Sequence, residues 1–284
     1  MVKKTKSNAV KKTPDPHANK PFVAAITPTY GRHKFLPWLI RMFNGQTYPQ
    51  SRMCLIILDD SPEEIQDENL LKMLQQPNIK FVRHTESKLT IGAKRNKLNE
   101  LAIEAGADII VAFDDDDFYP TDRVEHSVTT LTRTGAQISG SSIMYIYFAD
   151  DKIIKKFGPY GGDVKTTRHA TNGTFAYTKQ YAQTHKYDEI VAYGEESSFT
   201  HNFSEPLVQM DPFKAILCIS HMSNTFDKKM IKQGGAATVA KLKDFVKDKE
   251  IREFYQNLYE NQMKDPKFIP GTQHYVPIKM ELGN

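Results

Sequence analysis

The sequence has no apolar run long enough to span a bilayer, no secretory leader pattern and only two cysteines. A membrane-spanning helix needs about 20 consecutive apolar residues, and the lysines near the amino terminus have no apolar stretch behind them. Cys54 and Cys218 cannot form a disulfide framework, and each lies in an apolar run where a buried thiol is expected. These absences predict a cytoplasmic protein without a transmembrane segment.

The chain also lacks a strong excess of charge of one sign. It has 38 Lys and Arg against 34 Asp and Glu, and residues 1–20 alone hold six lysines and one aspartate. The remainder therefore has 32 basic and 33 acidic residues (38 less 6, and 34 less 1). A basic groove for nucleic acid would leave the globular part positive, so we predict no nucleic-acid partner. The tail, 1–20, is expected to be disordered, and contact with an anionic membrane surface is the alternative.

What the sequence does contain is an alternation of apolar strands and amphipathic helices. Strands are expected at 22–29, 53–61, 79–84 and 108–117, and helices at 33–48, 62–76, 91–106 and 120–135. This order predicts an α/β fold with a parallel, doubly wound sheet. Ligands of such sheets bind at the carboxyl ends of the strands. Residues 21–135 are therefore expected to form a nucleotide-binding half.

The second half of the chain is less regular. Two strands joined at 149–151, a strand and a helix within 166–185, a strand within 213–225 and a helical stretch at 236–263 are expected. No internal repeat or linker requires a second domain. We therefore expect one domain over 21–284, with a second half at 136–226 and a C-terminal helical extension at 227–284.

Residues 113–120 read FDDDDFYP, directly after an apolar run. Four adjacent carboxylates repel one another and lose hydration when the chain packs around them. A hard divalent cation takes oxygen ligands and would offset this repulsion. The pattern favours a Mg²⁺ or Mn²⁺ site over a solvated acidic turn.

Other polar residues follow the remaining strands. Asp59 and Asp60 end the second strand, where Asp59 could cap the following turn or helix and Asp60 could accept hydrogen bonds from a base ring. Lys94 and Arg95 begin a helix, where the helix dipole disfavours cations, so they indicate an anion such as a diphosphate or else a solvated helix face. Glu195 and Glu196 follow Gly194 as either a general base or a helix start.

Eight segments in this order resemble glycosyltransferase family 2 with its GT-A fold. They are ITPTYGR, QTYP, LIILDDS, GAKRNKLNELA, IIVAFDDDDFYPTDRVE, NGTFAYTK, GEESSF and SHMSNT, within residues 22–226. The resemblance implies a mixed, mainly parallel sheet flanked by helices in a single domain with a C-terminal helix. It also implies a metal-dependent, inverting hexosyl- or pentosyltransferase. The donor would be a nucleotide sugar, a UDP-sugar first of all, and the acceptor a hydroxyl group of a glycan or glycoconjugate, bound by the half at 136–226.

The resemblance carries roles onto residues of this sequence. Asp60 would pair with the base ring, and Arg95, with Lys94, would lie near the diphosphate. The full set of implied nucleotide-sugar-binding residues is Pro28, Thr29, Tyr30, Arg32, Asp60, Gly92, Lys94, Arg95, Asp114 and Asp115.

The same resemblance implies the metal and catalytic residues. Asp116 and His221 would bind Mn²⁺ or Mg²⁺ beside the diphosphate, and Asp114 would face the ribose. Because all four positions are Asp, Asp115 is an alternative metal ligand. Glu196 would be the general base, where the family usually has Asp, and Glu195 is the alternative.

Two further classes compete with this interpretation. A sugar-phosphate nucleotidyltransferase of the same fold usually has a glycine-rich loop after the first strand, but TPTYGRHKF has one glycine. A non-catalytic nucleotide- or carbohydrate-binding relative would not require the four aspartates together with Glu196.

Overall fold

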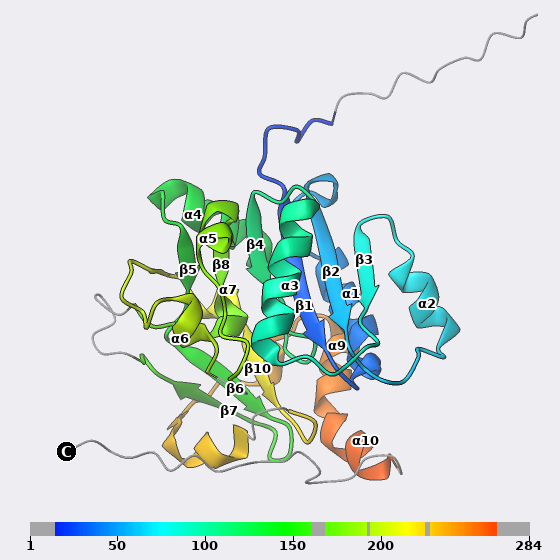
Figure 1. Cartoon of the computed structure of the whole chain (residues 1–284). Coiled ribbons are helices and arrows are strands. Elements are labelled where there is room, and N and C mark those ends of the chain that lie inside the picture. The colour runs from blue at the N-terminus through cyan, green and yellow to red at the C-terminus, as the bar shows by residue number, and fades with distance from the viewer. Residues whose placement is uncertain (1–14, 161–167, 192–193, 225–227, 266–284) are drawn as a thin grey trace, which may run out of the picture.

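A seven-stranded mixed sheet forms the centre of the protein (Figure 1). The computed structural model describes residues 15–160, 168–191, 194–224 and 228–265. Strands lie in the order β3-β2-β1-β4-β8-β5-β9. Their bounds are β1 (Val23–Thr29), β2 (Met53–Asp59), β3 (Ile79–Arg83), β4 (Ile109–Ala112), β5 (Ile138–Gly140), β8 (Ala176–Thr178) and β9 (Val208–Gln209). The first four are parallel, and β8 runs antiparallel to β4 and β5, which confirms the mixed, mainly parallel sheet.

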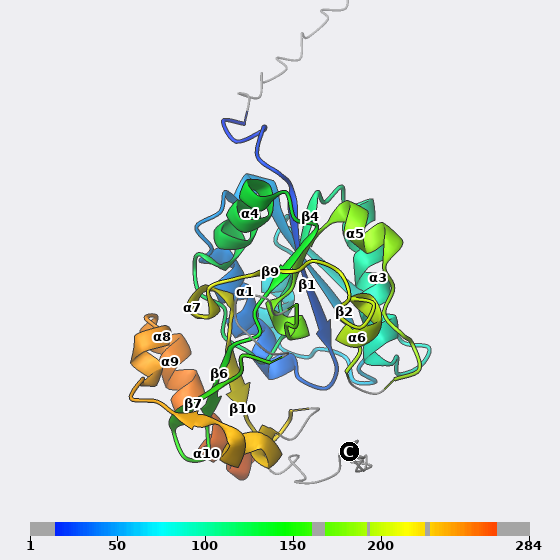
Figure 2. The same cartoon turned by 90° about the vertical axis from the view of Figure 1, so that its left-hand side faces the viewer.

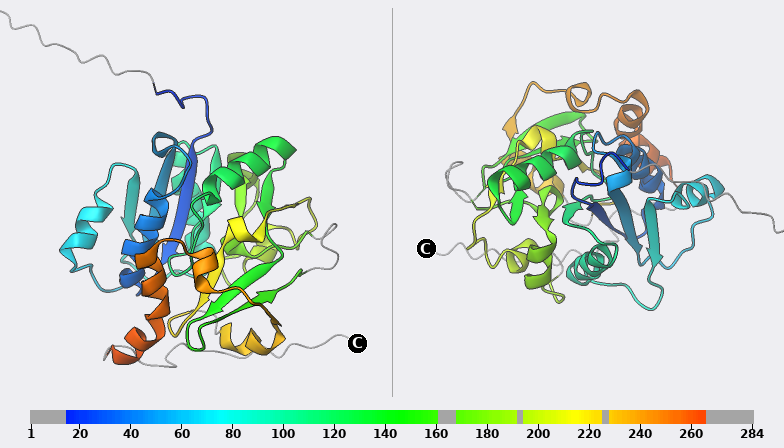
Figure 3. Two further views of the ribbon diagram at one scale, coloured as in Figure 1. Left: turned by 180° about the vertical axis from the view of Figure 1, so that it is seen from behind. Right: turned by 90° about the horizontal axis from the view of Figure 1, so that it is seen from above.

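Helices cover both faces of this sheet, as the views from the front and from behind show (Figures 1 and 3). α1 (Leu36–Asn44) and α4 (Arg123–Thr134) lie on one face, and α3 (Ile91–Glu104) and α5 (Lys179–Thr184) on the other. Successive side chains of a strand point to opposite faces. Ala25 of β1 accordingly packs in the core with α1, and Ile26 packs in the core with α3. Because both faces are buried, the strands are continuous apolar runs.

A second sheet of four strands extends the fold beyond the carboxyl ends of the first (Figure 2). Its order is β10-β6-β7-β11. The strands are β6 (Met144–Phe148), β7 (Ile153–Phe157), β10 (Leu217–Ser220) and β11 (Ala236–Ala237). A third apolar cluster packs Tyr147 and Ile219 of this sheet against Ile251 and Tyr255 near the end of the chain. The C-terminal helices are thereby fixed to the second sheet.

The remaining helices are short. They are α2 (Glu68–Leu74), α6 (Glu196–Phe199), α7 (Pro212–Ala215), α8 (Leu242–Phe245), α9 (Lys249–Gln256) and α10 (Leu258–Lys264). Single 3₁₀ segments lie at His33–Phe35, Gln50–Arg52, Asn172–Thr174 and Lys228–Gly234.

Two helical boundaries differ from the sequence expectation. The helix expected over 62–76 begins only at Glu68, because the Asp67 carboxylate caps it by accepting from the N–H groups of Asn69 and Leu70. The helical stretch expected over 236–263 is divided into three helices, and Asp248 caps the second of them in the same way. Asx caps stop a helix from extending backwards, which apolar spacing alone does not reveal.

The expected disordered tail at 1–20 lies mostly outside the described residues, as does the end of the expected C-terminal extension beyond residue 265. Among the described residues, no helix combines the length and apolar character that crossing a membrane requires.

Candidate functional site

The carboxyl ends of β1, β2 and β4 place the acidic and basic residues of the sequence motifs at one edge of the sheet. Thr29 is the register partner of Asp59 across β1 and β2, and Asp114–Asp117 follow β4 directly. The chain after Asp117 then pairs with the second sheet, since Phe118 and Leu217 exchange two backbone hydrogen bonds of 3.0 and 2.9 Å. This pairing brings the end of β10, with His221, to the four aspartates.

Arg32 binds the two central aspartates. Its Nη1 lies 2.7 Å from Asp116 Oδ2 and its Nη2 lies 2.8 Å from Asp115 Oδ1. Arg32 Nε and the hydroxyl of Thr29 both donate to Asp115 Oδ2, at 3.1 and 2.6 Å. Burial raises the pKa of Asp115 to about 7 despite the arginine. Burial also acts to raise the pKa of Asp116, but Arg32 and His221 outweigh it and hold that pKa well below its usual value.

The outer aspartates have cations of their own. Asp117 Oδ1 accepts from the Ile219 N–H at 2.7 Å and lies 3.3 Å from Lys228 Nζ. Asp114 Oδ1 lies 3.3 Å from Arg95 Nη2. The sequence argument assigned the compensation of carboxylate repulsion to a metal ion alone, and in this respect it was incomplete. Three cationic side chains of the protein share that task.

Within the described part of the chain, one oxygen of each aspartate in the tetrad accepts no hydrogen bond. These are Asp114 Oδ2, Asp115 Oδ1, Asp116 Oδ1 and Asp117 Oδ2, of which Asp115 Oδ1 forms the ion pair of 2.8 Å with Arg32 Nη2. Carboxylate oxygens are the ligands that Mg²⁺ and Mn²⁺ prefer. The chemistry of these donors suits such an ion, and Asp115, both of whose oxygens contact Arg32, is the less open of the two central aspartates.

His221 is buried beside Asp116 in a defined tautomer. Its Nδ1 accepts from the Ser223 N–H at 3.1 Å and lies 3.3 Å from Gln262 Nε2. Burial lowers the pKa of His221 to about 4, so the ring is neutral and its proton lies on Nε2. This proton is donated to Asp116 Oδ2 at 3.1 Å, and Asn224 Nδ2 donates to the same oxygen at 3.0 Å. In this arrangement His221 orients Asp116, and coordinating an ion through Nε2 would require the other tautomer.

The two glutamates after Gly194 differ in their surroundings. Glu195 is buried and accepts from Arg95 Nε at 2.8 Å. Glu196 begins α6, and its carboxylate contacts no other side chain by hydrogen bond or ion pair among the described residues. Burial, followed by the charge of Glu195, raises the pKa of Glu196. A carboxylate that has no side-chain partner among the described residues, and whose pKa is raised, suits a general base.

Lys94 has partners within the protein. Its ammonium forms a buried ion pair with Asp60 and donates to the Thr29 carbonyl oxygen at 3.2 Å. The other Asp60 oxygen accepts from the Leu89 N–H at 2.7 Å. The Tyr30 ring carries Lys88 Nζ 4.1 Å from its centroid and Lys94 Nζ 5.5 Å from it. These residues form one polar cluster between the end of β1 and the start of α3.

Gly92 and Pro28 have packing roles in this structure. A Cβ atom at Gly92 would lie 1.9 Å from the Asp188 carbonyl oxygen, so only glycine permits α3 to approach that backbone. Pro28 is buried within β1 and faces Leu58 in the register of β2.

Some contributors were not identified from the sequence. Lys228 lies 111 residues from Asp117, and no pattern marks it. Asn224 belongs to the segment SHMSNT, yet its contact with Asp116 spans 108 residues. Arg32 and Thr29 were expected to bind nucleotide, but their contacts with the aspartates were not foreseen.

The chain matches the model of the family described as Glycosyl transferase family 2 over residues 24–193. No curated protein matches it. Solved structures resemble it at low identity. S. aureus TarS 1–349 with UDP-GlcNAc has 14% identity and a TM-score of 0.52, covering 84% of this chain and 72% of that one. The same protein with UDP has 12% identity and a TM-score of 0.52, covering 85% and 71%.

Another structure of S. aureus TarS has 14% identity and a TM-score of 0.50. The match covers 84% of this chain but 43% of that one, so the chain spans less than half of its length. Similarity at this level of identity shows a shared GT-A fold.

Proposed function

The chain belongs to glycosyltransferase family 2, and on that premise we propose that it transfers a sugar from a nucleotide sugar to a hydroxyl group of a glycan or glycoconjugate. One observation carries the proposal. Arg95 contacts both Glu195 and Asp114, at 2.8 and 3.3 Å, and so joins the acid pair to the aspartate tetrad. Glu196, next to Glu195, therefore lies beside the group of charges that would hold a diphosphate.

A UDP-sugar is the donor we propose. TarS, which shares the fold, has been solved with UDP and with UDP-GlcNAc. In this chain the polar cluster of Tyr30, Asp60 and Lys94 would receive the base, with the Tyr30 ring as a stacking surface and Asp60 as the acceptor for a ring N–H.

Mn²⁺ or Mg²⁺ would be held by Asp116 and Asp114 through the oxygens that accept no hydrogen bond, with His221 fixing the orientation of Asp116. When bound, the cation supplies positive charge that stabilises the departing nucleoside diphosphate. Arg95 is the protein cation placed to assist, because its guanidinium already touches Asp114.

Glu196 would act as the general base. The acceptor oxygen forms a bond to the anomeric carbon while the bond from that carbon to the diphosphate oxygen breaks, and the hydroxyl proton passes to the Glu196 carboxylate. Attack from the face opposite the leaving group inverts the anomeric configuration. The raised pKa of Glu196 keeps it basic enough to accept this proton.

The test is a panel of UDP- and GDP-sugars incubated with the purified chain, with and without Mn²⁺. Donor binding is expected to raise the melting temperature, and hydrolysis or transfer is expected only with the metal. Turnover of every active donor in the presence of a chelator would contradict the metal assignment. Absence of any nucleotide-induced shift would contradict the function.

A further inference from the structure

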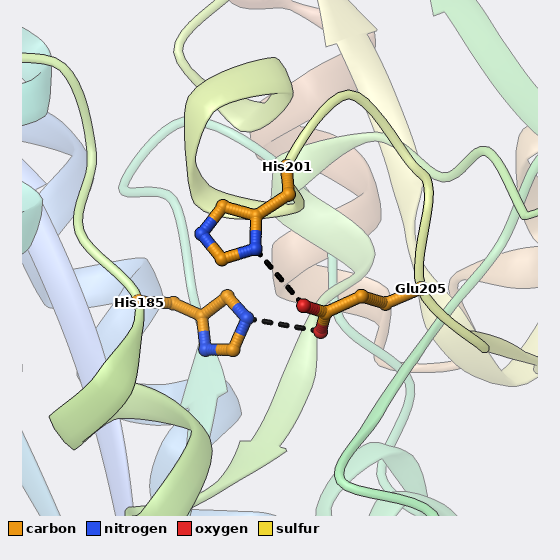
Figure 4. Close-up of side chains that lie close together, drawn as sticks. All are labelled: His185, His201 and Glu205. Carbon is orange, nitrogen blue, oxygen red and sulfur yellow. Dashed lines mark hydrogen bonds and ion pairs between the residues drawn. The ribbon is translucent and has the colours of Figure 1, made fainter.

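Outside the aspartate tetrad, a second group of potential metal ligands lies between α5 and the segment after α6 (Figure 4). His185 Nε2 lies 2.9 Å from Glu205 Oε2, and His201 Nδ1 lies 2.9 Å from Glu205 Oε1. One ligand atom from each residue falls within 4.8 Å of the others. The two imidazoles thus converge on one carboxylate from different elements of the chain.

The tautomer of His185 indicates what belongs between these groups. Its Nδ1 lies 3.0 Å from the Tyr181 carbonyl oxygen, which can only accept, and 2.9 Å from Thr184 Oγ1. Because the Thr184 hydroxyl can donate its own proton to the Gln180 carbonyl oxygen at 3.1 Å, a proton on Nδ1 satisfies all of these contacts. In a neutral ring, Nε2 then presents a lone pair to the Glu205 carboxylate. Lone pair and carboxylate repel each other unless a proton or a metal ion lies between them. A histidine whose other nitrogen donates to a backbone carbonyl is the usual arrangement of a metal ligand.

The surrounding structure holds the ligands in place. His185 is buried and its ring stacks on Tyr181 with 3.7 Å between centroids. His201, Asn202 and Phe203 all have positive φ, at 46°, 56° and 55°, a conformation that residues with a Cβ rarely adopt. Strained backbone of this kind persists where the surroundings over-determine it, and it is concentrated at functional sites.

We propose that His185, His201 and Glu205 bind one Zn²⁺ ion through His185 Nε2, His201 Nδ1 and a Glu205 oxygen. Two histidines and one carboxylate form a three-ligand zinc set that leaves the fourth position open. Imidazole ligands also select a transition metal over Mg²⁺, which separates this site from the all-oxygen pair of Asp114 and Asp116.

The open position has a place for a fourth ligand. A cavity of about 340 Å³ adjoins the site, and His185 and Glu205 themselves line it together with Tyr181, Thr184 and Pro206. Water or a small anion entering this cavity would complete the coordination.

Because of its position in the chain, the bound ion would also affect the segment that carries Glu196, and this consequence rests on the proposed function. The ligands bracket residues 186–200, and Glu195 and Glu196 lie between them. An ion that ties His185 to His201 and Glu205 would restrict the segment carrying the general base. Zn²⁺ would therefore support the orientation of Glu196 without touching substrate.

The experiment uses the metal-stripped full chain without any sugar nucleotide, so that its outcome does not depend on glycosyl transfer. Co²⁺ is titrated in excess Mg²⁺, which occupies oxygen sites, and the visible absorption of four-coordinate Co²⁺ is recorded before displacement by Zn²⁺. The wild-type chain is expected to bind one equivalent. His201→Ala and Glu205→Gln are expected to weaken binding by more than about tenfold.

Two variants serve as controls. Asp116→Asn, in the tetrad, and His17→Gln, a histidine remote in sequence from the cluster, are expected to keep the Co²⁺ spectrum. The melting curve of each variant in the presence of a chelator verifies that it is folded. If His201→Ala or Glu205→Gln fails this check, His201→Gln is used in its place. Absence of the spectrum in the wild-type chain, or its loss in Asp116→Asn with retention in His201→Ala, would overturn the proposal.

Discussion

Arg95 Nε donates a hydrogen bond to Glu195 Oε1 at 2.8 Å, which occupies the first glutamate of the pair and leaves Glu196 as the acid without a side-chain partner among the described residues. Glu196→Gln is therefore expected to lower kcat by about 10²- to 10⁴-fold, the usual contribution of a general base. Glu195→Gln, the matched control, keeps an oxygen for Arg95 and is expected to lose much less. Steady-state kinetics of the two variants show which glutamate is the general base. A larger loss of kcat in Glu195→Gln than in Glu196→Gln would assign that role to Glu195.

The pH dependence of the same residue gives a second prediction. The folded state raises the pKa of Glu196 above its unfolded value, mainly through burial. Over the interval between the two pKa values the folded protein binds more protons, so this group's contribution to stability falls as pH rises. Glu196→Gln is expected to gain stability relative to the wild type with rising pH. Denaturant unfolding at several pH values measures the difference, and a difference that is independent of pH would contradict it.

Asp115 and Asp116 form a matched pair for the metal assignment. Asp116→Asn is expected to weaken Mn²⁺-dependent binding of UDP, because Asp116 Oδ1 is open to a ligand. Asp115→Asn removes the carboxylate that contacts Arg32 and Thr29. This variant is expected to have a lower melting temperature but to keep the dependence of UDP binding on Mn²⁺. Calorimetric titration of UDP with and without Mn²⁺ distinguishes them. Loss of the effect only in Asp115→Asn would shift the ligand by one position.

The buried pair of Lys94 and Asp60 is expected to be costly to break. Lys94→Met leaves the Asp60 carboxylate in a buried position without its cation, and such losses amount to about 3–5 kcal/mol. The double variant Lys94→Met/Asp60→Asn is expected to be less destabilised than the sum of the single variants. Urea unfolding of the wild type, the two single variants and the double variant gives the double-mutant cycle. Strictly additive changes in the free energy of unfolding would show that the two side chains are not coupled.

Gly92→Ala tests the approach of α3 to the backbone at Asp188. The new methyl group would lie 1.9 Å from a carbonyl oxygen, so the backbone must shift, at a cost of about 1–3 kcal/mol. Gly45→Ala is the control, since its Cβ would have no neighbour closer than 3.4 Å. Thermal unfolding of both variants is the measurement, and equal stability of the two would contradict the close contact.

Much of the fold followed from local pattern. The strand and helix order of residues 22–135 was predicted because each element carries its own periodicity and stop signals. The second sheet was not predicted as a separate layer, since β10 and β6 pair across a separation of 72 residues at Leu217 and Tyr145. Short strands of this kind carry no information about their partners.

The sequence by itself determined where the chemical groups lie along the chain: carboxylates after β4, cations at the start of α3 and an acid pair after Gly194. Only the tertiary structure decided how they are used. Arg32 is bound to the tetrad, Arg95 to Glu195 and Lys94 to Asp60, although a sequence pattern offers all three cations equally to an anionic ligand. The reason is physical: a buried charge requires a partner within a few ångströms, and these partners lie between 34 and 100 residues away in the chain.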